Sequence, residues 1–114
     1  GTPGEENSSY NDSLDNDEIF LPETNALSQN FPNPFNPQTM IKFDVVNADN
    51  VEISIYDILG NEIITLTNDY YIAGNYSIIW GGNDYNGNPV SSGIYLYKYQ
   101  SSTDMFTRRM VLLR

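Results

Sequence analysis

The chain has 114 residues, of which 15 are acidic and 5 are basic, so its formal net charge at pH 7 is −10. This length supports one domain with a modest core. The acidity argues against a nucleic-acid partner, because binding to phosphate depends on clustered Lys and Arg. The sequence contains no Cys and no His, which excludes disulfide frameworks, thiol nucleophiles, zinc fingers and Ser–His–Asp triads.

Neither a membrane anchor nor a secretory leader is visible in the sequence. No run of residues approaches the roughly 18 apolar residues of a membrane span, and no signal peptide is present. The sequence begins with Gly1 rather than Met, so we expect a piece processed or excised from a longer protein.

The beginning of the chain differs in composition from the rest. Residues 1–18 hold six acids and no base, and their apolar content is little more than Tyr10 and Leu14. Such a stretch cannot bury enough surface to offset the entropy of ordering it. We therefore predict an acidic linker or arm over residues 1–25. An acidic interaction tail and an arm that becomes ordered on another subunit are the alternatives.

Alternation with a period of two dominates the remaining sequence. In residues 39–46, for example, Ile41, Phe43 and Val45 share one face, and turn-forming residues such as Gly60 separate successive runs. The strands predicted in this way cover residues 39–46, 51–57, 62–67, 76–80, 94–100 and 105–113. Several short strands at this spacing, without a convincing helical period, predict an antiparallel β-sandwich over residues 26–114.

Tyr95, Tyr97 and Tyr99 form a stripe on one face of the predicted strand over residues 94–100. We interpret them as core residues whose hydroxyl groups reach the rim of the sandwich. The alternative is an aromatic platform that stacks on sugar, which requires the stripe to face solvent. Lys98 lies on the opposite face and favours the inward orientation of the tyrosines.

Asp84, Asn86 and Asn88 place oxygen atoms at alternate positions, as calcium loops do. The distal carboxylate of the EF-hand pattern is missing, and Asn-Gly loops are more often plain turns. These three residues are therefore a calcium candidate, and we expect no other cofactor. Outside residues 1–18 the acids are scattered over turns and outward strand positions. This pattern does not favour the paired carboxylates of a glycosidase, and we expect the protein not to be an enzyme.

Residues 30–37 are the most unusual stretch, because three of their last six positions are Pro. Proline fixes φ and cannot donate into a sheet ladder. We therefore predict a rigid bend or edge at the beginning of the sandwich. Phe31 and Phe35 are expected to plug the end of the core.

This stretch and the motifs after it resemble the type A C-terminal sorting domain of the type IX secretion system. The later features are also similar to the Ig-like repeat of flagellar hook-capping proteins. The matching segments are NFPNPFNPQT at 30–39, VEISIYDILGNE at 51–62, AGNYSIIW at 73–80, the Gly, Asp, Pro, Ser and Tyr positions within 82–95, and TRRMVLLR at 107–114. One departure is Gly81, where the family commonly has Asp. The resemblance implies an immunoglobulin-like antiparallel sandwich of about seven strands.

The resemblance further implies a module without a catalytic role. It would be an address on secreted cargo, read by the translocon and shuttle proteins of the type IX system. The cargo would be secreted or delivered to the outer-membrane surface of a Gram-negative bacterium. We predict that Met110, Val111, Leu112, Leu113 and Arg114 form an edge strand that contributes to recognition by strand addition.

Two other functions are open at this point. The first is a self-assembling extracellular structural subunit, such as a filament, in which the arm of one copy pairs with a neighbouring sandwich. The donor strand would then be Ile19, Phe20 and Leu21, the first apolar cluster of the chain. The second is a carbohydrate-binding or spacer module of an extracellular enzyme, whose sugar contacts require Trp80 and the tyrosine stripe to be exposed.

Overall fold

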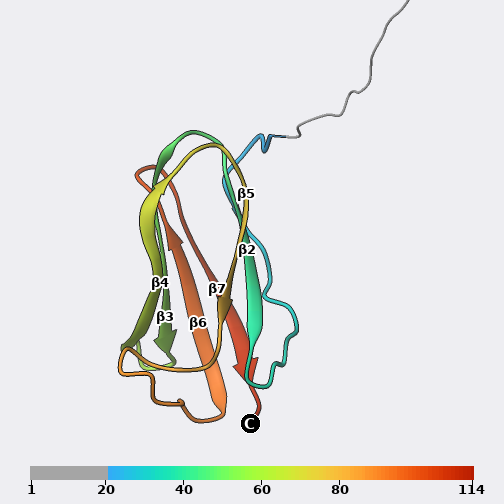
Figure 1. The fold of residues 1–114 in the computed structure, drawn as a ribbon, viewed down its shortest axis with the longest axis vertical. Helices are drawn as coiled ribbons and strands as arrows, with labels where there is room; N and C mark the ends of the chain where they lie inside the picture. Colours follow the sequence, from blue (N-terminus) through green and yellow to red (C-terminus); the bar gives the residue numbers. More distant parts are fainter. Residues whose placement is uncertain (1–20) are drawn as a thin grey trace, which may run out of the picture.

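The computed structural model describes residues 21–114, which form two antiparallel β-sheets packed face to face (Figure 1). The smaller sheet has the strand order β1-β2-β5, and the larger one has the order β4-β3-β6-β7. The strands are β1 (Ala26–Leu27), β2 (Thr39–Val45), β3 (Asp49–Asp57), β4 (Glu62–Tyr71), β5 (Gly74–Trp80), β6 (Gly93–Gln100) and β7 (Met105–Leu112). The predicted all-β sandwich is confirmed. Residues 21–114 contain no helix that could cross a membrane.

The core lies between the two sheets and consists of the inward positions of alternating strands. Ile41, Phe43 and Val45 of β2 are buried, as the period of two predicts. The same pattern holds along β3 and β6. The complete set of buried core residues is Leu27, Phe35, Ile41, Phe43, Val45, Val51, Ile53, Ile55, Trp80, Tyr95, Tyr97, Tyr99, Met110 and Leu112.

β4 extends further than the hydrophobic pattern predicts. The alternation ends at Thr67, yet the strand continues to Tyr71, because residues 68–71 pair with residues 49–52 of β3. Polar residues such as Asn68 carry no signal for this pairing in the sequence. Two register shifts between β3 and β4 mark bulges, which increase the local twist and make this edge less regular.

The aspartate at the end of β3 organises the turn into β4. Asp57 Oδ1 accepts hydrogen bonds from the backbone N–H groups of Leu59 and Asn61, both at 2.9 Å, and Oδ2 accepts one from the Asn61 side chain at 3.1 Å. Gly60 has a φ of 92°, which glycine adopts without strain. The backbone hydrogen bond from Asn61 is the main reason that the pKa of Asp57 lies below its ordinary value of 3.8.

Replacing Asp57 with Ala should lower the Tm by a few degrees at neutral pH, because two backbone N–H groups lose their acceptor. Folding lowers the pKa of Asp57, so its stabilising contribution is fully present above the unfolded value and is lost as the pH falls through the folded value. The Tm difference from the native chain should therefore shrink below pH 3.8. Thermal melts of Asp69→Ala, at an exposed position of β4, provide the control; a difference that is constant with pH would contradict this role.

The tyrosine stripe points into the core, as predicted. Tyr95, Tyr97 and Tyr99 are all buried, and so is Trp80. Burial raises the pKa of Tyr97 and Tyr99. A sugar-binding platform made of these four residues is therefore excluded, because a buried ring cannot stack on a ligand.

The hydroxyl group of Tyr97 connects the larger sheet to the segment that follows β1. It donates to Ser28 O at 2.6 Å and accepts a hydrogen bond from Asn30 N at 2.8 Å. The hydroxyl group of Tyr99 makes one longer bond, to Asp44 O at 3.3 Å. Tyr97 thus satisfies two backbone groups where the chain enters the sandwich, while Tyr99 satisfies one.

Tyr97→Phe should reduce the free energy of unfolding by about 1–3 kcal/mol, because the ring stays but the buried Asn30 N–H and the Ser28 carbonyl lose their partner. Tyr99→Phe keeps the same ring and loses a single weak bond, so its loss should be smaller. Urea denaturation of the two variants measures both values. Equal losses would show that the hydroxyl of Tyr97 has no special role.

Candidate functional site

The Pro-rich segment, residues 29–38, covers part of the edge of the larger sheet. The buried ring of Phe35 packs against Trp80, with the ring centroids 5.7 Å apart. The Phe35 N–H donates to Val111 O at 3.0 Å, and its carbonyl accepts from Leu113 N at 2.9 Å. Phe35 therefore plugs the core, as predicted, and also adds a backbone partner to β7.

The C-terminal residues predicted to mediate recognition lie along this covered edge. β7 is an edge strand in the sheet order, as predicted. However, Met110 and Leu112 are fully buried, and the outward backbone groups of Val111 and Leu113 are bonded to the Pro-rich segment. The outward backbone groups of Val111 and Leu113 are therefore already paired within this chain. A role of residues 110–114 in recognition stays a prediction. The side chains of Leu113 and Arg114 remain exposed.

Arg114 holds the loop between β5 and β6 in place. Its Nε donates to Val90 O and its Nη2 to Gly82 O, both at 2.6 Å. Gly82 has a φ of 77°, and a Cβ at this position would lie 2.8 Å from Arg114 Nη2. The backbone conformation thus favours glycine at this position, and a side chain here would also displace the guanidinium group of Arg114.

The calcium candidates Asp84, Asn86 and Asn88 come together in a tight turn of the same loop. Asp84 Oδ1 accepts hydrogen bonds from Asn86 N at 2.9 Å and from Asn88 N at 3.0 Å. The carboxylate thus organises the backbone, as aspartates in turns commonly do. Within residues 21–114, no group of three or more acidic side chains is suited to a metal ion. Calcium binding at this turn stays a prediction.

Phe31 lies on the outer face of the smaller sheet, and the prediction that it plugs the core is wrong. Its neighbour Asn30 takes the buried position instead, so the Phe31 ring turns outward and is 79% exposed. Two backbone hydrogen bonds to Met40, at 2.9 and 2.8 Å, fix its position. Met40 and Ile79 are also exposed and border a shallow groove of about 310 Å³ beside the ring. We call Phe31, Met40 and Ile79 the outer patch.

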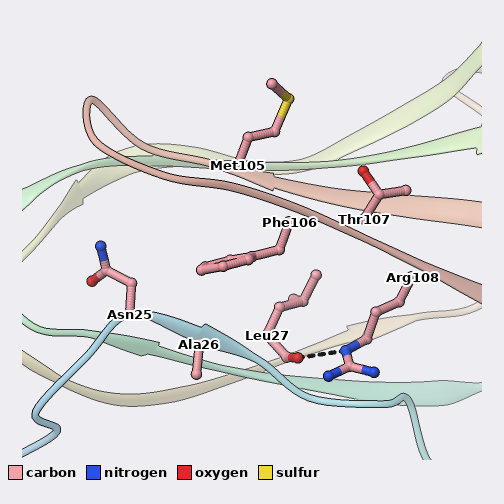
Figure 2. A pocket seen from close by; sticks show the side chains of 7 residues that line it. All are labelled: Asn25, Ala26, Leu27, Met105, Phe106, Thr107 and Arg108. Carbon is pink, nitrogen blue, oxygen red and sulfur yellow. Dashed lines mark hydrogen bonds between the residues drawn. The ribbon is translucent and has the colours of Figure 1, made fainter.

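A larger groove, of about 570 Å³, lies where β1 of one sheet approaches β7 of the other (Figure 2). Leu27 and Phe106 line it from the two sheets. At one end, Arg108 crosses the seam and its Nε donates to Leu27 O at 2.5 Å. At the other end, Asn25 Nδ2 donates to Asp104 Oδ2 at 2.7 Å. This seam groove is lined by Asn25, Ala26, Leu27, Met105, Phe106, Thr107 and Arg108.

Most of the predicted arm, including the donor residues Ile19 and Phe20, lies outside the described residues. Leu21, the third residue of this candidate, is described and is 59% exposed. The chain then reaches the sandwich at Asn25, which lines the seam groove. The candidate donor run is therefore only a few residues from the groove along the chain.

Sequence reasoning missed both the outer patch and the seam groove. Alternation along residues 76–80 places Ile79 on the face opposite Ile78 and Trp80. Nothing in the sequence indicates that Phe31 turns outward and lies beside it. The sequence gives a weak indication that Met105 is exposed, because it directly follows the polar turn of residues 101–104 and so begins a strand at the rim of the sandwich.

The sequence comparisons place this fold in a family. The family model of the FlgD Ig-like domain matches residues 35–104, which is more than half of the chain. The chain belongs to the FlgD Ig-like domain family. No curated protein sequence matches it.

Three solved structures are similar to this chain. FlgD from P. aeruginosa is 26% identical with a TM-score of 0.52, over 65% of this chain and 57% of that one. Dimeric latent PorU from Porphyromonas gingivalis is 20% identical with a TM-score of 0.61, over 79% of this chain and 9% of that one. PorZ, described as an essential surface component of the type-IX secretion system of the same species, is 20% identical with a TM-score of 0.49, over 79% and 11%.

This Ig-like domain therefore spans just over half of FlgD and a small part of the two Porphyromonas proteins. The family match establishes the immunoglobulin-like character of the sandwich. The likeness to PorU, at this level of identity, concerns the fold.

The two phenylalanines of the Pro-rich segment should differ sharply in their effect on stability. Phe35→Ala should lower the free energy of unfolding by about 3–5 kcal/mol, because it leaves a cavity against Trp80. Phe31→Ala should change it by less than about 0.5 kcal/mol, because the ring is exposed. Chemical denaturation distinguishes the two cases, and similar losses would contradict the assignment of Phe31 to the surface.

Proposed function

We propose that residues 26–114 act as a C-terminal sorting domain of the type IX secretion system. In this role the folded domain is an address that the translocon and its shuttle proteins recognise by protein contacts. It directs the protein to which it is attached to the medium or to the outer-membrane surface of a Gram-negative bacterium. The domain performs no chemistry of its own.

Two lines of evidence support the proposal. The motifs that resemble type A sorting domains follow one another in order from residue 30 to residue 114. The two-sheet sandwich is shared with a segment of PorU and with the FlgD Ig-like family. Within the Pro-rich motif, Phe31 is the large apolar residue that the core does not explain, because its ring is exposed.

The observation that carries the proposal is the exposure of Phe31. Its ring contributes little to the core, yet the backbone that holds it is fixed by hydrogen bonds to β2. Large apolar side chains displayed on a rigid surface are typical of protein–protein contacts. A recognition module needs such a contact, and the covered edge at residues 110–113 does not offer a free strand for it. We therefore assign the outer patch as the main recognition surface.

A secretion assay tests this proposal. The full chain is fused after a reporter that carries an inner-membrane signal peptide, in a host that has a type IX system. The native fusion should appear in the medium or on the cell surface. Phe31→Ser should reduce the exported fraction about tenfold or more, because a central apolar contact is lost. The reporter should then accumulate in the periplasm.

The matched control is Leu59→Ser, which changes an equally exposed apolar residue, 84% exposed, at the turn after β3. This variant should be exported like the native chain. Retention of the native fusion in the periplasm would contradict the sorting function. Export of Phe31→Ser at the native level would leave sorting intact but overturn the role of the outer patch.

A further inference from the structure

The outward edge of β7 is open over its first half. Val111 directs its backbone groups away from β6, because its carbonyl accepts a hydrogen bond from Phe35 N. Backbone direction alternates along a strand, so the N–H and C=O groups of Met105 and Thr107 also point away from β6. Within residues 21–114, no backbone partner is found for the outward groups of these two residues. Such groups are a template for the addition of another strand.

The seam groove runs along this open edge and has the size of a short apolar strand. From Met105 to Arg108 the chain advances three residues, which is about 10 Å in a strand. The groove has a mixed lining, in which Leu27 and Phe106 are apolar and Asn25, Thr107 and Arg108 are polar. The Met105 side chain is 61% exposed. The hydrogen bonds at the two ends limit its length. An extended segment of about three residues therefore fits.

The chain carries one apolar run of this size outside the sandwich. Ile19, Phe20 and Leu21 are consecutive, and Pro22 ends any strand that they form. The run follows a strongly acidic stretch, residues 15–18, in which three of the four residues are Asp or Glu. An occupant from this segment would bring both apolar side chains and negative charge to the groove.

The two ends of the groove differ in charge, which determines the direction of the occupant. Arg108 lies at one end and Asp104 lies at the other, and Arg109 follows Arg108 in β7 on the opposite face of the strand. Within residues 21–114, no carboxylate pairs with Arg108, whose side chain bonds to the Leu27 carbonyl. A strand antiparallel to β7 places residues 15–18 beside Arg108 and Leu21 beside Met105. The opposite direction would bring the acids against Asp104.

Leu21, the described residue of this run, does not line the groove of its own chain. Leu21 is 59% exposed, and the chain leads away from the sandwich over the residues before β1 (Figure 1). We propose that the seam groove binds residues 19–21 from the arm of a second copy, which pair with Met105 and Thr107 of β7. The inference does not depend on the proposed sorting function. It makes the domain an acceptor as well as a donor in an assembly of identical chains.

Light scattering of the full chain over a range of concentrations tests the proposal. The native chain should associate as its concentration rises, and salt should weaken the association, since Arg108 and the acids contribute to it. In the proposed direction Met105 lies beside the apolar Leu21, so Met105→Glu places a charge against an apolar side chain and should weaken association about tenfold or more. Met105→Leu is the matched control. It keeps the same exposed position apolar and should associate like the native chain.

A second pair of variants tests the donor. Phe20→Asp should abolish association, whereas Tyr10→Asp changes an aromatic residue outside the apolar run and should have little effect. Hydrogen exchange then locates the contact, because the amides of Met105 and Thr107 should become protected as the native chain associates. This protection should be absent in Phe20→Asp.

Three results would overturn the proposal. The native chain could remain monomeric up to about 1 mM, which would exclude any association of useful strength. Association could persist unchanged in Met105→Glu and Phe20→Asp, which would place the contact elsewhere. The amides of Met105 and Thr107 could be protected equally in the monomer, which would show that each arm occupies its own groove. None of these outcomes bears on export, so the sorting function is tested separately.

Discussion

The sandwich depends on one residue that satisfies two different physical requirements. The ring of Phe35 fills the space against Trp80 at the end of the core, and its backbone pairs with the outward groups of β7. Buried apolar area and paired backbone groups are both needed at the edge of a small sandwich. The position of Phe35 also brings Asn33 close enough to accept a hydrogen bond from Val111 N. As a result, the half of β7 nearest the C-terminus is covered.

The sequence predicts the parts of this fold that depend on local patterns. Alternation places Ile41, Ile53 and Tyr97 in the core correctly, because a strand has a period of two wherever it pairs. Turns such as that of Asp57 follow from neighbouring residues alone. The covering of β7 could not be predicted, because the contact between Asn33 and Val111 joins positions separated by 78 residues. The outward turn of Phe31 likewise depends on tertiary hydrogen bonds.

The two candidate surfaces are separate features of one small domain. The outer patch lies on the outer face of β2 and β5, whereas the seam groove lies between β1 and β7, and they share no lining residue. A partner on one surface therefore does not occupy the other. Their chemistry differs as well. The patch consists of exposed apolar side chains, whereas the groove combines unpaired backbone groups with an arginine. A single sandwich can in this way be recognised by another protein while it also contacts copies of itself.

The closing contacts also have a kinetic consequence. Arg108 bonds to Leu27 across 81 residues of sequence, and Phe35 meets Val111 over a similar separation. Domains held by such long-range contacts fold slowly, typically in milliseconds to seconds, because distant segments must meet before burial stabilises them. A chain that lacks β7 has neither contact, and Phe35 has no edge to join. The two contacts that close the sandwich therefore cannot form until β7 is present, so we expect folding to be completed only after this last strand is available.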